Sequence, residues 1–298
     1  YFVFAVLLNS VGTVILQSIT SFDVSKTDAS TLEGFKDLSI AFVSFFVASF
    51  IPRIGYQVAL CLGLAMVAVV CLLTPLFAEF FFIKILFATI GTAFALVKIS
   101  VYSLIGQLSV DTKSHSSLMN TVEGIFMVGV LSGYWVFSGF INADNPASIE
   151  WLNVYYLLGG LIVLAAVFVY FAPIEREPFV PHEAGALSEF TDMLKLTYQP
   201  LVLIFVISIF LYVLVEQGIG SWLPTFNREV LGLPVDISIQ ITSIFAAMIA
   251  IGRLLAGVIL RFVPWYIFVN GCLVMMFLTI ILTLPMTENL PHGVVSGI

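Results

Sequence analysis

Long apolar blocks dominate the chain, and short polar segments separate them. Nine blocks are predicted to be membrane-spanning helices, since most approach the roughly 20 residues that cross a hydrocarbon core. They cover residues 2–21, 37–51, 56–77, 80–108, 117–141, 151–172, 200–224, 237–260 and 264–286, and a tenth starts near Pro291. Runs such as residues 58–73 do not alternate apolar with polar positions, which excludes barrel strands. We therefore expect an all-α, multi-pass membrane protein.

Two of the connectors are long, residues 22–36 and residues 173–199. The second is the most polar stretch of the chain and follows the sixth span, so we expect it to separate two helical bundles. The expected domains are residues 1–172, a six-helix bundle; residues 173–199, a cytoplasmic linker; and residues 200–298, an incomplete second bundle. Because the chain begins inside an apolar block at Tyr1 and stops at Ile298 as another block begins, we expect a fragment.

Composition and motifs exclude several classes of function. Only 10% of the residues are charged and 60% are hydrophobic, whereas soluble domains carry about 25% charged residues. The net charge of −7 includes no basic tract, so nucleic acid is not an expected partner. The three cysteines have no metal-ligand spacing, and nucleotide-binding and nucleophile motifs are absent from the sequence. We expect no enzymatic activity, no cofactor and no metal.

Basic residues near the ends of the spans indicate the orientation, because cytoplasmic loops carry more Lys and Arg. With the first end in the cytoplasm, cytoplasmic segments hold six basic residues and outside segments hold four. The cytoplasmic set is Arg53, Lys113, Arg176, Lys195, Arg253 and Arg261, and the outside set is Lys26, Lys36, Lys84 and Arg228. This orientation places the linker of residues 173–199 in the cytoplasm.

An internal repeat supports the two-bundle prediction. Residues 7–12 of the first span can be laid over residues 215–220 of the seventh, at an offset of 208 residues. The same offset places Arg53 on Arg261, each near a short turn between two spans. Ordered matches at one offset predict a parallel repeat of six spans.

Two bundles joined by a central linker resemble the major facilitator superfamily, and three motifs resemble its fucose–proton symporter family. Residues 211–225 look like that family's seventh helix, residues 252–262 resemble its signature between helices eight and nine, and residues 118–129 resemble the start of its fifth helix. The resemblance implies a major-facilitator fold of two six-helix bundles, with about nine and a half of twelve helices in this chain. It also implies sugar transport through a cavity lined by helices one, four, seven and ten.

The proton-coupling carboxylates of the resembled family do not carry over to this sequence. Their positions in helices one and four correspond here to Thr13 and to Val97 or Lys98. Glu123 stands where that family tends to carry an amide. We predict proton coupling through Glu123 and Glu216 instead.

Polar side chains within the apolar blocks form the candidate site, since a charge at membrane depth is costly unless it faces a cavity or a partner. Asn9, Thr13 and Gln17 are spaced by four residues and share a helix face. The predicted substrate-binding residues are Asn9, Thr13, Gln17, Lys98, Tyr102, Glu216, Gln217 and Trp222. Cavity lining and helix–helix hydrogen bonding both account for such residues.

Three further expectations concern individual contacts. Lys98 and Glu123 lie at comparable depths on neighbouring spans, so we expect an ion pair that is either structural or functional. Gly129 and Gly133 are expected to allow close helix packing. Family resemblance suggests gating roles for three basic residues, and snorkelling to the interface explains them equally well. They are Arg53, Arg253 and Arg261.

These patterns predict a secondary active transporter that moves a small polar solute by alternating access. The expected solute is a sugar and the expected coupling ion is the proton. We expect a monomer in the bacterial inner membrane, whose partners are the solute, protons and the lipid bilayer. The alternatives are a transporter of an anionic sugar or organic acid that uses Lys98, a drug exporter, and a non-transporting sensor on the same fold.

Overall fold

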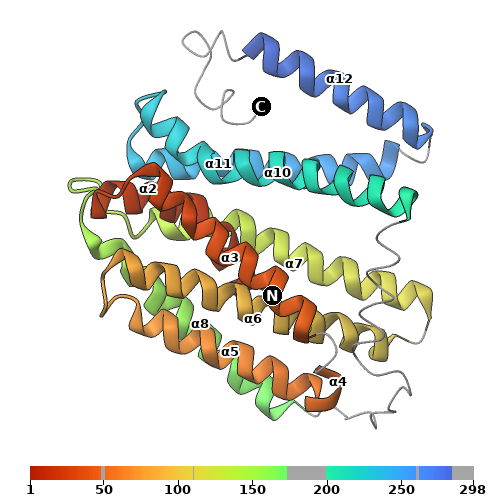
Figure 1. Cartoon of the computed structure of the whole chain (residues 1–298), viewed down its shortest axis with the longest axis horizontal. Coiled ribbons are helices and arrows are strands. Elements are labelled where there is room, and N and C mark those ends of the chain that lie inside the picture. Colours follow the sequence, from red (N-terminus) through yellow and green to blue (C-terminus); the bar gives the residue numbers. More distant parts are fainter. Residues whose placement is uncertain (48–50, 110, 173–198, 260–261, 284–298) are drawn as a thin grey trace.

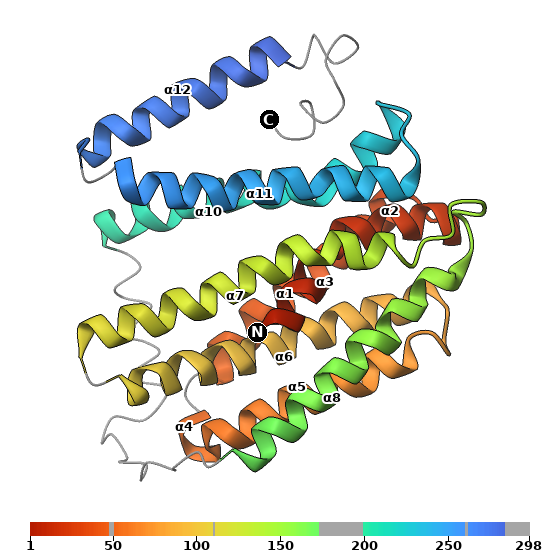
Figure 2. The same ribbon diagram turned by 180° about the vertical axis from the view of Figure 1, so that it is seen from behind.

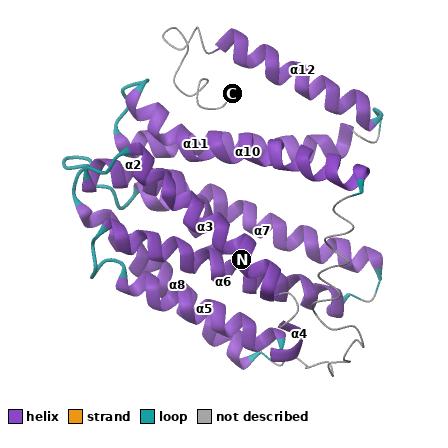
Figure 3. Ribbon diagram, viewed as in Figure 1, coloured by secondary structure: helices purple, strands orange, loops and turns teal. Residues whose placement is uncertain are grey.

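The computed structural model describes residues 1–47, 51–109, 111–172, 199–259 and 262–283. Within these ranges the chain forms helices joined by loops and no strand (Figure 3). The α-helices are α1 (Phe2–Asn9), α2 (Val11–Phe22), α3 (Lys26–Val47), α4 (Ile51–Ile54), α5 (Tyr56–Leu73), α6 (Phe80–Leu108), α7 (Thr112–Ser138), α8 (Val154–Phe171), α10 (Pro200–Glu229), α11 (Val235–Ile259) and α12 (Trp265–Thr283). A 3₁₀ helix, η1 (Ile149–Asn153), leads into α8.

The helices have the length and composition of membrane spans. Among the described residues, six helices are long and apolar enough to cross a membrane, and α1 with α2 form a seventh span with a 45° bend. Large apolar side chains point outward, such as Phe168 and Phe171 on α8, which are 77% and 75% exposed. Lipid accepts such a surface, and helices satisfy their backbone polar groups internally. The chain is thus an all-α membrane protein.

The first half of the molecule is a tightly packed group of helices. In it α5 packs against α6 and α8, while α3 packs along α6 (Figure 1). Phe87, Trp151 and Tyr155 are fully buried in its apolar core. At the crossing of α3 and α6, Gly91 lies so close that an added Cβ would overlap the backbone oxygen of Lys36.

The second half meets the first along two helix pairs. Helix α10 packs against α2, and α11 packs against α7 (Figures 1 and 2). Leu16 of α2, Tyr134 of α7 and Ile239 of α11 belong to one buried cluster at this boundary. Helix α12 lies outermost, beyond α10 and α11.

The two halves touch mainly near one end. At the end where α2 and α10 finish, which we term the closed end, Lys26 pairs with Glu229 at 2.5 Å and Gln240 donates to the Ser138 hydroxyl at 3.2 Å. Every buried residue of α10 lies at or beyond Ser221, in the half of the helix nearer this end. Toward the opposite end, the open end, α7 and α10 draw apart (Figure 2).

The structure corrects two features of the predicted spans. The second span was expected to begin at residue 37 after a long connector, but α3 begins at Lys26, since Ser25 caps it through its hydrogen bonds with Asp28. The first span was expected to be continuous, but it breaks at Ser10. The charged residues that suggested a connector form the outer part of α3.

Candidate functional site

A small polar cavity lies between the two halves. It encloses about 150 Å³ and is bounded by the first span, α7, α10 and α11. Its polar lining includes Asn9, Glu216 and Gln217, three of the predicted substrate-binding residues. The remaining lining residues are Val11, Phe126, Met127, Val130, Tyr134, Gly220, Ser221, Phe245, Ala246 and Ile249. The cavity thus combines amides, a carboxylate, hydroxyls and three aromatic rings.

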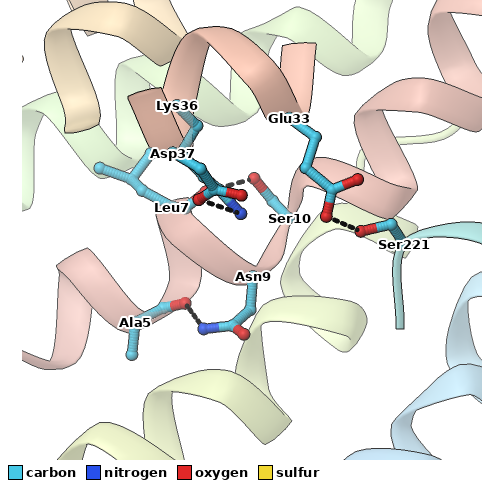
Figure 4. Close-up of polar contacts among 8 residues, drawn as sticks. All are labelled: Ala5, Leu7, Asn9, Ser10, Glu33, Lys36, Asp37 and Ser221. Carbon is cyan, nitrogen blue, oxygen red and sulfur yellow. Dashed lines mark hydrogen bonds and ion pairs between the residues drawn. The ribbon is translucent and has the colours of Figure 1, made fainter. Parts of the chain in front are cut away.

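The break in the first span lies beside this cavity. Asn9 ends α1 and Val11 begins α2, and both line the cavity. The Asn9 amide donates to the Ala5 backbone oxygen at 2.9 Å, and the Ser10 hydroxyl donates to the Leu7 backbone oxygen at 2.8 Å (Figure 4). Interrupted helices next to a cavity are a common way for membrane proteins to present polar groups to a solute.

Glycines allow the two halves to approach just beyond the cavity. An added Cβ on Gly12 of α2 would lie 2.7 Å from the Ser221 backbone oxygen and 2.9 Å from that of Gly220. Gly12 and Gly220 are counterparts in the internal repeat, as are Asn9 and Gln217. Residues related by the offset of 208 therefore lie at the boundary between the halves.

A hydrogen bond from the cavity wall crosses between the halves at this point. The Ser221 hydroxyl on α10 donates to the Glu33 carboxylate on α3 at 2.8 Å, and the two side chains point toward one another in Figure 4. One turn along α3, Lys36 is 4% exposed and pairs with Asp37 at 3.4 Å. Glu33 and Lys36 fall in the segment that was expected to be a connector, so they were not among the predicted site residues.

Five of the eight predicted binding residues lie elsewhere than on the cavity wall, namely Thr13, Gln17 and Trp222, and also Lys98 and Tyr102, which belong to a second cluster. Thr13 and Gln17 on α2 are each 1% exposed, and their side-chain polar atoms lack a hydrogen-bond partner within the described part of the chain. Trp222 packs against the apolar core of the first half. The aromatic surface expected from Trp222 is instead provided by Phe126, Tyr134 and Phe245.

Lys98, Tyr102 and Glu123 form a second polar cluster. The Tyr102 hydroxyl donates to the Glu123 carboxylate, and the Lys98 ammonium lies 5.7 Å from the ring centre of Tyr102 and 5.7 Å from that of Phe94. These distances are within the range of cation–π attraction, about 6 Å. The expected ion pair between Lys98 and Glu123 is wrong: among the described residues, Tyr102 occupies that place beside the carboxylate.

An aromatic ring links the second cluster to the cavity. Phe126 lines the cavity, lies one helical turn after Glu123 on α7, and its ring centre is 6.1 Å from that of Phe94. Helix α7 begins at the open end, so Glu123 is nearer that end than Phe126. The cluster therefore lies one turn from the cavity on its open side.

The remaining predictions concern packing and gating. Gly129 contacts α1, where an added Cβ would lie 2.5 Å from the Phe2 backbone oxygen, and Gly133 faces Val6. Close packing is confirmed at Gly129, whereas an added Cβ on Gly133 would make ordinary contact with Val6 at 3.5 Å. Of the gating candidates, Arg261 and the side chains of Arg53 and Arg253 lie outside the described residues.

Comparison with known families agrees with this architecture. A family model described as Major Facilitator Superfamily matches residues 1–296. No curated protein sequence matches the chain.

Proposed function

Because the chain belongs to the Major Facilitator Superfamily, it is a multi-pass membrane transporter of small molecules, and we propose that its solute is a sugar carried together with protons. The observation that carries this proposal is the cavity in which Asn9, Glu216 and Gln217 converge. Amides both donate and accept hydrogen bonds and a carboxylate accepts them, so the three side chains match the hydroxyl groups of a sugar. Phe126, Tyr134 and Phe245 offer apolar surface for its C–H groups.

The size and charge of the cavity favour this solute over the alternatives. Sites for drug-sized ligands enclose roughly 300–1,000 Å³, whereas this cavity encloses about 150 Å³. Glu216 is the ionisable acid of the lining, and Lys98 is not part of it. A small neutral solute therefore suits the cavity better than a large drug or an anion does.

Movement of the two halves against each other would expose the cavity to the two sides of the membrane. Contacts between them near the closed end would break, and new contacts near the open end would form, so that the cavity faces each side of the membrane in turn. With the orientation expected from the basic residues, the closed end faces outward and the structure represents the state that faces the cytoplasm. Solute and protons drive this exchange only by binding the two states unequally.

Uptake into proteoliposomes tests the proposed site. Neutral hexoses, uronates and lipophilic cations are supplied in turn, and the neutral hexoses are expected to be accumulated. Asn9→Ala and Gln217→Ala are expected to raise KM for the transported hexose about fivefold to tenfold, since each removes a hydrogen bond worth roughly 1 kcal/mol. Accumulation of only uronates or only lipophilic cations contradicts the proposal.

Asn270→Ala is the matched control for Asn9→Ala. Both asparagines lie in helices and donate to the backbone oxygen four residues earlier, Asn9 at 2.9 Å and Asn270 at 2.8 Å. Asn270 is on α12, remote from the cavity, so Asn270→Ala should leave KM unchanged. Equal effects of the two substitutions would assign the loss to helix stability and not to solute binding.

A further inference from the structure

Glu33 connects the cavity wall to the contact between the halves. Its carboxylate on α3 accepts the Ser221 hydroxyl of α10 at 2.8 Å (Figure 4). Ser221 is 2% exposed and lines the cavity. One buried hydroxyl thus belongs both to the solute site and to the contact that holds the halves together.

The backbone around Ser221 fixes the position of this hydroxyl. Gly12 of α2 fits directly against the backbone of Ser221, with space for a hydrogen atom and not for a methyl group. Lys26 and Glu229 pair about two helical turns nearer the closed end, at 2.5 Å. Because α10 is held at both points, the backbone of Ser221 stays beside Glu33 while this end is closed.

We propose that Glu33 is a positioning residue of the transport cycle, which acts through Ser221 to favour the state whose closed end is shut. The bond joins the two halves, so it stabilises this state and is lost when the closed end opens. A hydrogen bond to a carboxylate is stronger than one between neutral groups. A solute hydroxyl that engages Ser221 from the cavity weakens its bond to Glu33, and cavity occupancy and closure are thereby coupled. This inference rests on the proposed function, which requires the closed end to open.

The rate at which a maleimide labels a cysteine at the closed end tests the assignment without any solute. Ser138 is 6% exposed and contacts Gln240 across the boundary, so Ser138→Cys is the reporter, with the native cysteines replaced by serine. Glu33→Ala and Ser221→Ala are each expected to raise the labelling rate of the purified protein about tenfold, which corresponds to the loss of one charge-assisted hydrogen bond. The double variant should label no faster than either single variant.

Two further variants complete the experiment. Glu33→Gln keeps an acceptor oxygen and should raise labelling less than Glu33→Ala does. Glu150→Ala is the control, since Glu150 accepts from Asn142 within the same half at 3.2 Å and should leave the rate unchanged. If Glu33→Ala fails to fold, Ser221→Ala removes the same bond.

The outcomes separate this inference from the proposed function. Unchanged labelling in Glu33→Ala and Ser221→Ala, or effects that multiply in the double variant, overturns the assignment of Glu33 even if hexose uptake is observed. Faster, non-additive labelling supports it even if the hexose assay identifies no solute. If Glu33 only supports the fold, its removal should lower the yield of folded protein and should not selectively raise the labelling rate of the Ser138→Cys reporter.

Discussion

Glu123 is one of the two residues at which we expect protonation to be coupled to movement. Its carboxylate accepts the Tyr102 hydroxyl, and the Lys98 ammonium lies over the Tyr102 ring. Glu123→Gln fixes the side chain in a neutral form of nearly the same shape. If protonation of Glu123 drives the cycle, this variant should lose accumulation against a gradient and keep solute exchange. Hexose uptake and counterflow in the same proteoliposomes measure the two activities.

Tyr102→Phe is the companion variant to Glu123→Gln. It removes the hydrogen bond and leaves the carboxylate able to take up a proton, so accumulation should persist. Full accumulation by Glu123→Gln contradicts the role assigned to this residue. Loss of exchange as well as accumulation would show that Glu123 supports the fold or the solute site and not the coupling.

At the residue scale, the sequence could identify polar side chains in apolar blocks but could not tell which of them share a cavity. Asn9 was predicted from its spacing with Thr13 and Gln17 on one face of the first span, and Gln217 from its place beside Glu216 within an apolar block. Ser221 and Tyr134 gave no such signal, since hydroxyls are common in membrane helices and bond to their own backbone. Trp222 was expected at the site, but neighbouring helices direct it into the core of the first half.

At the element scale, hydrophobic pattern predicted most helices within a few residues and failed at α3. Lys26, Glu33 and Lys36 make the first part of α3 resemble a connector, but this segment is helical and contacts α2, α6 and α10. The Ser25 and Asp28 pair is a helix-start signal that could have placed the beginning correctly. The charged residues were therefore interpreted as a connector, whereas they belong to the first turns of α3.

Packing of α3 against α6 gives a prediction at the same scale. Gly91→Ala places a methyl group against the Lys36 backbone, which cannot move aside without shifting α3. The expected loss is about 1–3 kcal/mol of folding free energy, measured as a lower Tm in detergent. Gly106→Ala on the same helix is the control, because the added methyl group meets no atom within 4 Å. Equal Tm values for the two variants would show that the α3–α6 crossing tolerates separation.

At the scale of the whole molecule, the internal repeat predicted two related bundles of six spans. Residues related by the offset of 208 meet in the structure, Gly12 with Gly220 at the helix crossing and Asn9 with Gln217 at the cavity. If the two halves rotate about an axis that passes near these pairs, the pairs move least. In such a rotation the cavity and the crossing change little, and the largest displacements are expected at the ends of the helices.

Lys26 and Glu229 lie at one of those ends, where the displacement between the two halves is expected to be largest. The double variant Lys26→Cys with Glu229→Cys, joined by a short bis-maleimide, ties α3 to α10 at the closed end. If this end must open in each cycle, the bridge should abolish hexose uptake, while the unbridged variant retains it. Asn142→Cys with Glu150→Cys is the matched control, since both residues belong to the same half and contact each other at 3.2 Å. The bridge in this control should leave hexose uptake intact. Continued hexose uptake with the Lys26–Glu229 bridge in place would exclude a cycle that opens the closed end.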